Sequence, residues 1–265
     1  NKLLFFIEVL KMLIVVSPAK KLNMDPIQGI NSTKPDFSAN AEELINLTRS
    51  LSVDEIMGLM GISSNLAQLN MERFSSFGTQ EKKPAALAFA GDTYKGLDAE
   101  TLSSEDLNWA QNHLRIISGL YGVLRPLDDI EPYRLEMGSK LEGKHGKSLY
   151  DYWGKKISEK LNDDAKNNGS NILINCASNE YFNAISSSSL SLNVITPIFI
   201  DRKNGKEKVI SFYAKKARGT MARFIIQNRL TKVDELKSFD IDGYKYQSDQ
   251  STDKNLSFVR DHPLN

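Results

Sequence analysis

Short apolar runs, bounded by polar or turn-forming residues, recur along the whole chain. Such runs predict buried strands, because a strand covered on both faces reads as a continuous hydrophobic stretch. The runs predicted as strands are 13–16, 86–90, 172–176, 194–200 and 209–213, with weaker candidates at 244–247 and 256–259. Between them, apolar residues at helical spacing predict helices at 41–50, 53–60, 64–74, 104–117, 148–161 and 217–230.

The predicted strands and helices alternate over the full length, and no linker rich in Pro, Gly and Ser divides the chain. Asn204-Gly205 predicts a tight hairpin between two strands, because both central residues of a type I′ turn need positive φ. The last predicted strand, 256–259, is expected at a sheet edge. The fold class is therefore α+β, a single compact mixed α/β domain at 12–265 with a central mixed sheet and surrounding helices. Residues 1–11 form an upstream extension, since Met12 opens the first strand-like run and is the expected natural start.

Composition narrows the class of protein. The single cysteine, Cys176, has no partner for an intramolecular disulfide, which indicates a reducing compartment such as the bacterial cytoplasm. The balance of 34 basic and 33 acidic residues excludes a polycation. Any nucleic-acid binding must therefore come from charge clustered on one face. No segment approaches the length of apolar sequence that a membrane span needs, so none is predicted.

A helical hairpin is predicted at residues 54–67, where two short helical stretches flank Gly61, Ile62 and Ser63. The pattern resembles the helix-hairpin-helix element of DNA-repair proteins, whose turn reads Gly-hydrophobic-Gly. Such a hairpin presents backbone amides to a phosphate oxygen without reading base identity. Ser63 replaces the second glycine, which restricts the approach to phosphate, although its hydroxyl can donate a hydrogen bond or cap the helix at Ser64. The alternative is an ordinary helical hairpin packed on a core.

A basic cluster lies at residues 211–224. A predicted strand delivers Lys215, Lys216 and Arg218 to the start of a helix that also carries Arg223. There the four cations could meet an anion alongside free backbone amides, which makes a plausible phosphate cradle. In the alternative interpretation, Lys215 and Arg223 are partly solvated surface charges.

The stretch 119–138 is rich in Gly and Pro and is predicted to be irregular. An irregular stretch that carries Tyr, Arg and acidic residues on a rigid scaffold is typical of a binding site. Arg125 and Arg134 could contact phosphate or carboxylate groups in a bidentate manner. Either could instead pair with a nearby carboxylate such as Asp128 and hold the loop. We favour a mixed site in which at least one arginine has a structural role.

Three polar segments follow predicted strands, at 17–20, 91–96 and 175–181. Their side chains could converge at one end of the sheet, where proteins of this class place clefts. The alternative is that they are loop residues with ordinary turn chemistry. The candidate cleft residues are Lys20, Asp92, Tyr94, Arg125, Asp128, Tyr133, Arg134 and Glu180. This concentration of acids, bases and anion-binding groups also fits an enzyme that acts on a nucleotide or another anionic metabolite.

Several familiar sites are absent from the sequence. It contains no Walker-type loop, no Gly-x-Gly-x-x-Gly fingerprint, and no HExxH or CxxC spacing. The three histidines are far apart and none lies with carboxylates at metal-ligand spacing, so we predict no structural zinc. We also predict no other metal and no cofactor, and we assign no catalytic residue. Direct iron sequestration has weak support, although a carboxylate-only site stays open. A buried apolar role is favoured for Cys176 over a redox-sensitive thiol.

Long stretches of the chain resemble the YaaA peroxide-stress-resistance family. They include SPAKKL at 17–22, AFAGDTYKGLDAET at 88–101, HLRIISGLYGVLRPLDDIEPYRLEMG at 113–138, LYDYWGKKI at 149–157 and ISFYAKKARGTMARFIIQNRLTK at 210–232. The resemblance extends from Met12 to about Arg260. It implies a bacterial cytosolic protein that helps cells withstand hydrogen peroxide by limiting unincorporated iron and oxidative damage to DNA.

The resemblance also implies a single mixed α/β fold with a helix-hairpin-helix element and a positively charged cleft that binds duplex DNA. Carried onto this sequence, the hairpin falls at Gly61, Ile62 and Ser63. The basic cleft draws on Lys215, Lys216, Arg218 and Arg223. Contact with the phosphate backbone through these groups would not depend on base sequence.

Overall fold

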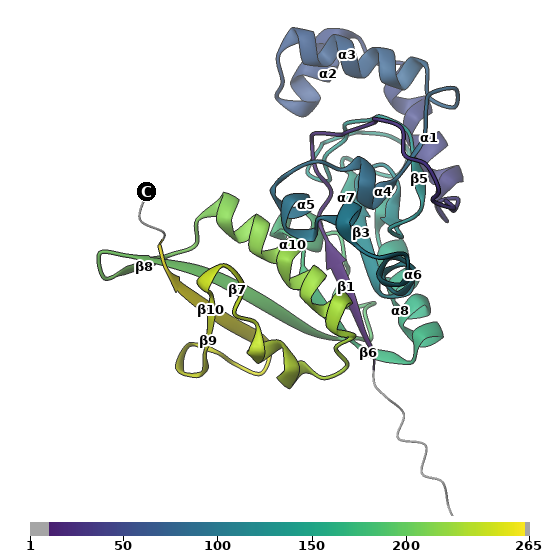
Figure 1. Cartoon of the computed structure of the whole chain (residues 1–265). Coiled ribbons are helices and arrows are strands. Elements are labelled where there is room, and N and C mark those ends of the chain that lie inside the picture. Colours follow the sequence, from purple (N-terminus) through teal and green to yellow (C-terminus); the bar gives the residue numbers. More distant parts are fainter. Residues whose placement is uncertain (1–10, 263–265) are drawn as a thin grey trace, which may run out of the picture.

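One twisted sheet organises the chain in the computed structural model, which describes residues 11–262 (Figure 1). The strands are β1 (Lys11–Val16), β2 (Lys83–Pro84), β3 (Leu114–Ser118), β4 (Gly122–Leu124), β5 (Asp129–Ile130), β6 (Ser170–Cys176), β7 (Asn193–Lys203), β8 (Lys206–Lys208), β9 (Lys245–Gln247) and β10 (Asn255–Asp261). The main sheet has the order β4-β3-β1-β6-β7-β10-β9, with β8 paired to β7, and β2 and β5 form a separate pair. The five central strands run parallel, whereas β4, β8 and β9 pair antiparallel to their neighbours.

Helices surround this sheet. They are α1 (Ser38–Arg49), α2 (Val53–Met60), α3 (Ser64–Ser75), α4 (Ala85–Ala88), α5 (Asp92–Leu97), α6 (Ser104–His113), α7 (Leu149–Trp153), α8 (Lys156–Asn168), α9 (Asn179–Phe182) and α10 (Ser211–Asn228), with 3-10 turns at Ala99–Thr101, Val233–Ser238, Ile241–Gly243 and Ser248–Gln250. In Figure 1, α2 and α3 project at one end of the molecule and α10 lies across the strands. The predicted single mixed α/β domain is confirmed. Within residues 11–262, no helix combines the length and the apolar character that crossing a bilayer requires.

The centre of the core is β1, whose residues Met12 to Val16 are fully buried. A strand flanked on both sides by parallel neighbours and covered by helices needs apolar side chains on both faces, which explains its unbroken hydrophobic run. The hairpin at Asn204 and Gly205 is confirmed, since both residues have positive φ between β7 and β8. Residues 1–10 of the predicted extension lie outside the described part, and β1 begins at Lys11, two residues before the predicted strand 13–16.

Some predicted elements are wrong. The run 86–90 lies mostly in the short helix α4, and 209–213 is not a strand, because α10 begins at Ser211. The predicted helix 104–117 ends at His113 and continues directly as β3. A short apolar run fits a buried helix as well as a buried strand, so periodicity alone could not separate them. The predicted helix 148–161 is divided into α7 and α8 at Gly154, and β10 lies between β7 and β9 instead of at an edge.

Candidate functional site

A cleft opens where the parallel strands β1 and β6 end at the same edge of the sheet. The segments after these strands are joined by Ser17, whose Oγ accepts a hydrogen bond from the Ser178 amide at 2.8 Å. The start of α5 and the first turns of α10 complete the walls. The cleft has a volume of about 660 Å³ and is lined by Ser17, Pro18, Ala19, Lys20, Lys21, Ala90, Gly91, Asp92, Thr93, Cys176, Ser178, Asn179, Glu180, Tyr181, Lys215 and Arg218. The three polar segments therefore meet, as the sequence predicts, although 86–90 is not a strand.

Two glycines bring α5 and α10 together at one wall of the cleft. A Cβ at Gly219 would lie 1.7 Å from the Thr93 carbonyl oxygen, and one at Gly96 would lie 2.0 Å from the Lys216 carbonyl oxygen. The two helices therefore touch backbone to backbone, which only a residue without a side chain permits. This contact fixes Asp92, at the start of α5, relative to the basic side chains of α10.

Two cations of α10 line the cleft without a counterion. Among the residues that the structure describes, neither Lys215 nor Arg218 forms an ion pair or a side-chain hydrogen bond. Lys215 is exposed, whereas Arg218 is partly buried, and burial lowers the pKa of its guanidinium. Desolvating a cation is costly unless an opposite charge compensates it. The cleft therefore favours an anionic ligand near Arg218.

The other two basic residues predicted for this cluster have structural partners. Lys216 forms an ion pair with Asp242 at 2.9 Å. Arg223 donates to the carbonyl oxygens of Leu97 and Asp98, at 3.0 and 2.6 Å. Neither side chain lines the cleft. The four cations also lie on a helix from its first turns onward, not at the end of a strand.

The acidic residues of the cleft are engaged. Asp92 pairs with Lys95 at 3.2 Å, and Glu180 accepts a hydrogen bond from the Gly138 amide at 3.1 Å. Lys20, which lines the cleft, and Arg134, which does not, both contact Glu136 Oε1, at 3.1 and 2.9 Å. Arg134 thus stands next to the cleft with its charge compensated by a carboxylate.

Glu136 gives a test of this arrangement. Burial alone would raise the pKa of the Glu136 carboxyl. The nearby cations Arg134 and Lys20 outweigh burial and hold this pKa below its ordinary value of 4.5. A carboxylate with a depressed pKa stabilises the fold above its unfolded pKa, and this contribution disappears as the pH falls through the folded pKa. We expect Glu136→Gln to lower the unfolding free energy by about 1 kcal/mol at neutral pH. Urea unfolding at about pH 7 and pH 3 should show the difference from the native protein shrinking in acid. A difference that stays constant with pH would contradict the pairing.

Tyr94 and Tyr133, two of the predicted cleft residues, hydrogen-bond to segments next to the cleft. The Tyr94 hydroxyl donates to the Ser17 carbonyl oxygen at 3.0 Å, and the Tyr133 hydroxyl shares a hydrogen bond with Ser118 Oγ at 2.6 Å. Both rings are buried, and burial raises the pKa of both hydroxyls. These tyrosines are therefore neutral near physiological pH and hold the loop after β1 and the end of β3 in place.

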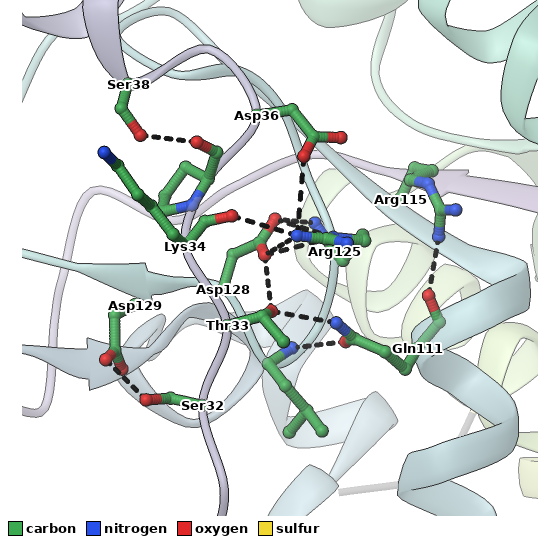
Figure 2. Close-up of polar contacts among 12 residues, drawn as sticks. Ser32, Thr33, Lys34, Asp36, Ser38, Gln111, Arg115, Arg125, Asp128 and Asp129 are labelled. Atoms are coloured by element: carbon green, nitrogen blue, oxygen red, sulfur yellow. Dashed lines mark hydrogen bonds and ion pairs between the residues drawn. The ribbon is translucent and has the colours of Figure 1, made fainter.

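Arg125 and Asp128 lie away from the cleft lining, in a polar network shown in Figure 2. Arg125 contacts Asp128 Oδ1 at 2.8 Å and donates to the Lys34 carbonyl oxygen at 2.9 Å. Thr33 Oγ1 donates to the same carboxylate at 2.6 Å. Arg125 and Asp128 thus connect the irregular stretch 119–138 to the segment before α1 that contains Thr33 and Lys34. Arg125 therefore has a structural role, as does Arg134 through Glu136, whereas the sequence predicts such a role for at least one of the two.

Cys176 ends β6 at the floor of the cleft. Its side chain is buried, and burial raises the pKa of the thiol to about 12, with Arg218 opposing the shift. A thiol in this environment stays protonated and is a poor nucleophile. The predicted buried apolar cysteine is confirmed. It adds no negative charge that would compete with a bound anion.

The hairpin at Gly61, Ile62 and Ser63 is built by local signals, with Gly61 and Ser63 exposed and Ile62 partly buried against the core. Ser52 and Glu55 form a capping box at the start of α2, and Gly61 ends the helix with φ of 60°. The amides of Gly61 and Ile62 both donate to the Met57 carbonyl oxygen, at 2.8 and 3.3 Å. The donors left for a phosphate are therefore the first amides of α3, where Ser63 provides no side-chain cap.

The hairpin and the cleft border one common segment. A groove of about 610 Å³ separates α2 from residues 138–142 and is lined by Leu51, Glu55, Gly58, Leu59, Gly138, Lys140, Leu141 and Glu142. Gly138 is the residue whose amide binds Glu180 in the cleft. The segment 138–142 therefore connects the cleft with the helix that leads into the hairpin turn.

A further pocket of about 340 Å³ adjoins the cleft and was not predicted from the sequence. It is lined by Lys21, Asn23, Ala86, Leu87, Phe89, Ala90, Gly91, Tyr94, Lys95, Asp98, Ala99 and Glu100. Lys21, Ala90 and Gly91 line both cavities. Nothing in the spacing of its apolar residues distinguishes them from core residues.

Across residues 11–262, no group of three or more His, Cys, Asp and Glu side chains is placed to hold a metal ion.

These features define an α/β protein with a cleft, lined in part by the cations Lys215 and Arg218, at the carboxyl edge of a parallel sheet. The chain belongs to the family described as peroxide stress protein YaaA, whose model matches residues 12–250. It is 51% identical to a UPF0246 protein of Dinoroseobacter shibae over 256 residues, covering 95% of this chain and 96% of that protein. A UPF0246 protein of Ruegeria pomeroyi is 51% identical over 253 residues, covering 94% and 98%. One from Aliivibrio fischeri is 50% identical over 255 residues, again covering 94% and 98%. The family resemblance seen in the sequence is confirmed.

Proposed function

We propose that this protein acts in the cytoplasm during peroxide stress and binds the phosphate backbone of duplex DNA without sequence specificity. The observation that carries the proposal is the pair of cations, Lys215 and Arg218, that line the cleft with no counterion among residues 11–262. Membership of the peroxide stress protein family supports the setting. In this role the protein would limit oxidative damage to DNA.

The proposed contact joins the cleft to the hairpin. Lys215 and Arg218 would each neutralise a phosphate, and the first amides of α3, after Ser63, would bind another through the dipole of that helix. The groove along residues 138–142 is lined on its other side by α2, the helix that leads into the hairpin turn. Because the net charge is only +1, binding would depend on this local arrangement and weaken steeply with salt.

Fluorescence anisotropy with a labelled duplex tests this proposal. The double variant Lys215→Ala/Arg218→Ala is expected to bind about tenfold more weakly at low salt, because two phosphate contacts are lost. The slope of log affinity against log salt should decrease by about 2. Affinities should be the same for duplexes of unrelated sequence.

The matched control is Lys155→Ala/Lys237→Ala, which removes the same charge from side chains paired with Glu159 and Asp234. It should leave the affinity and the salt slope nearly unchanged. Equal weakening in both double variants would assign the effect to net charge and rule out the cleft as the binding surface. Binding that does not respond to salt would rule out contact with the phosphate backbone, and with it the whole proposal.

We also propose that the protein lowers the amount of unincorporated iron in stressed cells, which would reduce peroxide-driven damage. Family membership is the support for this part. Titration of the purified protein with iron separates two routes. Stoichiometric binding would indicate sequestration by the protein itself, whereas an unchanged free-iron signal would indicate an indirect effect.

A second candidate function is an enzyme that acts on a nucleotide or another anionic metabolite. It is favoured by the placement of Asp92 and Glu180 in the same 660 Å³ cleft as Lys215 and Arg218. Acidic and basic groups gathered in one pocket are the usual components of acid–base chemistry. A cavity of this volume also falls within the range of small-molecule sites.

A further inference from the structure

The cleft and its neighbouring pocket differ in character. The cleft is lined by charged side chains of α10, whereas the apolar residues Ala86, Leu87, Phe89 and Ala99 contribute to the lining of the pocket. Their volumes, about 660 and 340 Å³, both lie within the range found for small ligands. Because Lys21, Ala90 and Gly91 line both, one ligand could extend from the first cavity into the second.

The polar half has the features of an anion site. Arg218 is partly buried and, like Lys215, lacks an ionic partner in the part of the chain that the structure describes. Each nearby acid already has a partner, since Asp92 pairs with Lys95 and Glu180 accepts the Gly138 amide. A planar guanidinium in this position suits the two oxygens of a phosphate or carboxylate.

The apolar half suits a flat ring. Phe89 and Tyr94 lie with ring centroids 5.3 Å apart and planes inclined by 38°, and the buried Leu87 lines the same pocket. Polar side chains at the edge, including Asn23 and Glu100, can pair with heteroatoms of a bound ring. An apolar floor with a few polar groups at its margin is the usual composition of a ligand pocket.

We propose that the two cavities form one site for an aromatic heterocycle that carries a phosphate or a carboxylate, the chemical class of the nucleoside monophosphates. The anionic group would bind Arg218 and Lys215, and the ring would occupy the pocket against Phe89 and Leu87. This inference rests on the second candidate function, since it names the ligand class for that cleft, and it does not depend on duplex binding.

Calorimetric titration of the full chain with adenosine 5′-monophosphate, ribose 5-phosphate and adenosine tests the two halves separately. The complete nucleotide is expected to bind at least about tenfold more tightly than either fragment, because only it fills both cavities. For a carboxylate, indole-3-carboxylate is the complete ligand, and acetate and indole are its two fragments. Either complete ligand exceeding its fragments supports the proposal and identifies the anionic group, whereas complete ligands no tighter than their fragments would overturn it.

Two variants assign the halves to the cavities. Arg218→Gln should weaken the complete ligand about tenfold and leave adenosine unchanged, since it removes one charge-assisted contact. Asn23→Trp, at the half-buried margin of the pocket, should reduce the complete ligand to the affinity of ribose 5-phosphate. Loss of both fragments in either variant would contradict this assignment.

Thermal unfolding shows whether each variant is folded. Saturation-transfer NMR on the native protein provides a separate test that needs no variant. Ring protons of the complete ligand should receive saturation, because the ring is enclosed by protein. Saturation confined to the sugar would overturn the proposal. Failure of this ligand proposal is distinguishable from failure of the DNA-binding proposal, because fluorescence anisotropy with a labelled duplex tests DNA binding separately on the same protein.

Discussion

Replacing Gly219 with alanine is expected to lower the free energy of unfolding by about 3 kcal/mol or more. The added Cβ would lie 1.7 Å from the Thr93 carbonyl oxygen and 2.8 Å from the Leu97 amide nitrogen. Both obstacles are backbone atoms, so no rotation of a side chain can relieve the overlap. The helices α5 and α10 must separate, and this opens a buried contact between them.

Urea unfolding of Gly219→Ala and Gly58→Ala makes a matched comparison. Gly58 lies inside helix α2 with nothing within 4 Å of its added Cβ, so the gain in helix propensity should stabilise that variant by up to about 1 kcal/mol. The two substitutions are chemically identical, and only the space around them differs. Similar effects in both would show that α5 and α10 are not in backbone contact.

The same substitution should affect the site. Lys215 and Arg218 precede Gly219 on α10, and Asp92 begins α5, so movement of one helix changes the separation of the cleft walls. The sequence contains both glycines, but neither Gly96 nor Gly219 is distinguishable by local pattern from any other glycine in a helix. Their role depends on a contact between residues more than a hundred positions apart.

Local signals account for the elements that the sequence predicted well. The unbroken apolar run of β1 and the turn at Asn204 and Gly205 each define an element by themselves. The helix α2 was predicted with its observed bounds, because Ser52 and Gly61 mark its two ends. In contrast, β3 follows α6 without a turn residue between them, so its apolar residues read as another turn of helix.

The convergence of the cleft loops was predictable for a related reason. Parallel strands place their carboxyl ends at one edge, so the segments after β1 and β6 had to meet there. In contrast, the sequence could not show which of the four cations remain available to bind a ligand. Lys216 is engaged by Asp242 and Arg223 by carbonyl oxygens near Asp98, and these partners lie far along the sequence. Arg125 has its partner three residues away, which is why the sequence could anticipate its structural alternative.

Replacing Asp201 with asparagine is expected to cost about 3 to 5 kcal/mol of unfolding free energy. Asp201 is 1% exposed and accepts hydrogen bonds from Arg260 Nε at 2.7 Å and the Tyr244 hydroxyl at 3.1 Å. The guanidinium of Arg260 also lies 4.5 Å from the ring centroid of Tyr213, on α10, and 4.4 Å from that of Tyr244. Asparagine keeps the shape but leaves this buried cation without a compensating charge.

Chemical denaturation of three variants separates the buried charge from the loss of a contact. Glu207→Gln removes one carboxylate from the half-exposed pair with Arg202 and should change stability by less than about 1 kcal/mol. Asp201→Asn/Arg260→Met removes both charges and should be more stable than Asp201→Asn alone, because no uncompensated cation remains. If the double variant is no more stable than Asp201→Asn, the packing of Arg260 against the two tyrosine rings outweighs its charge, and the electrostatic account of this cluster fails.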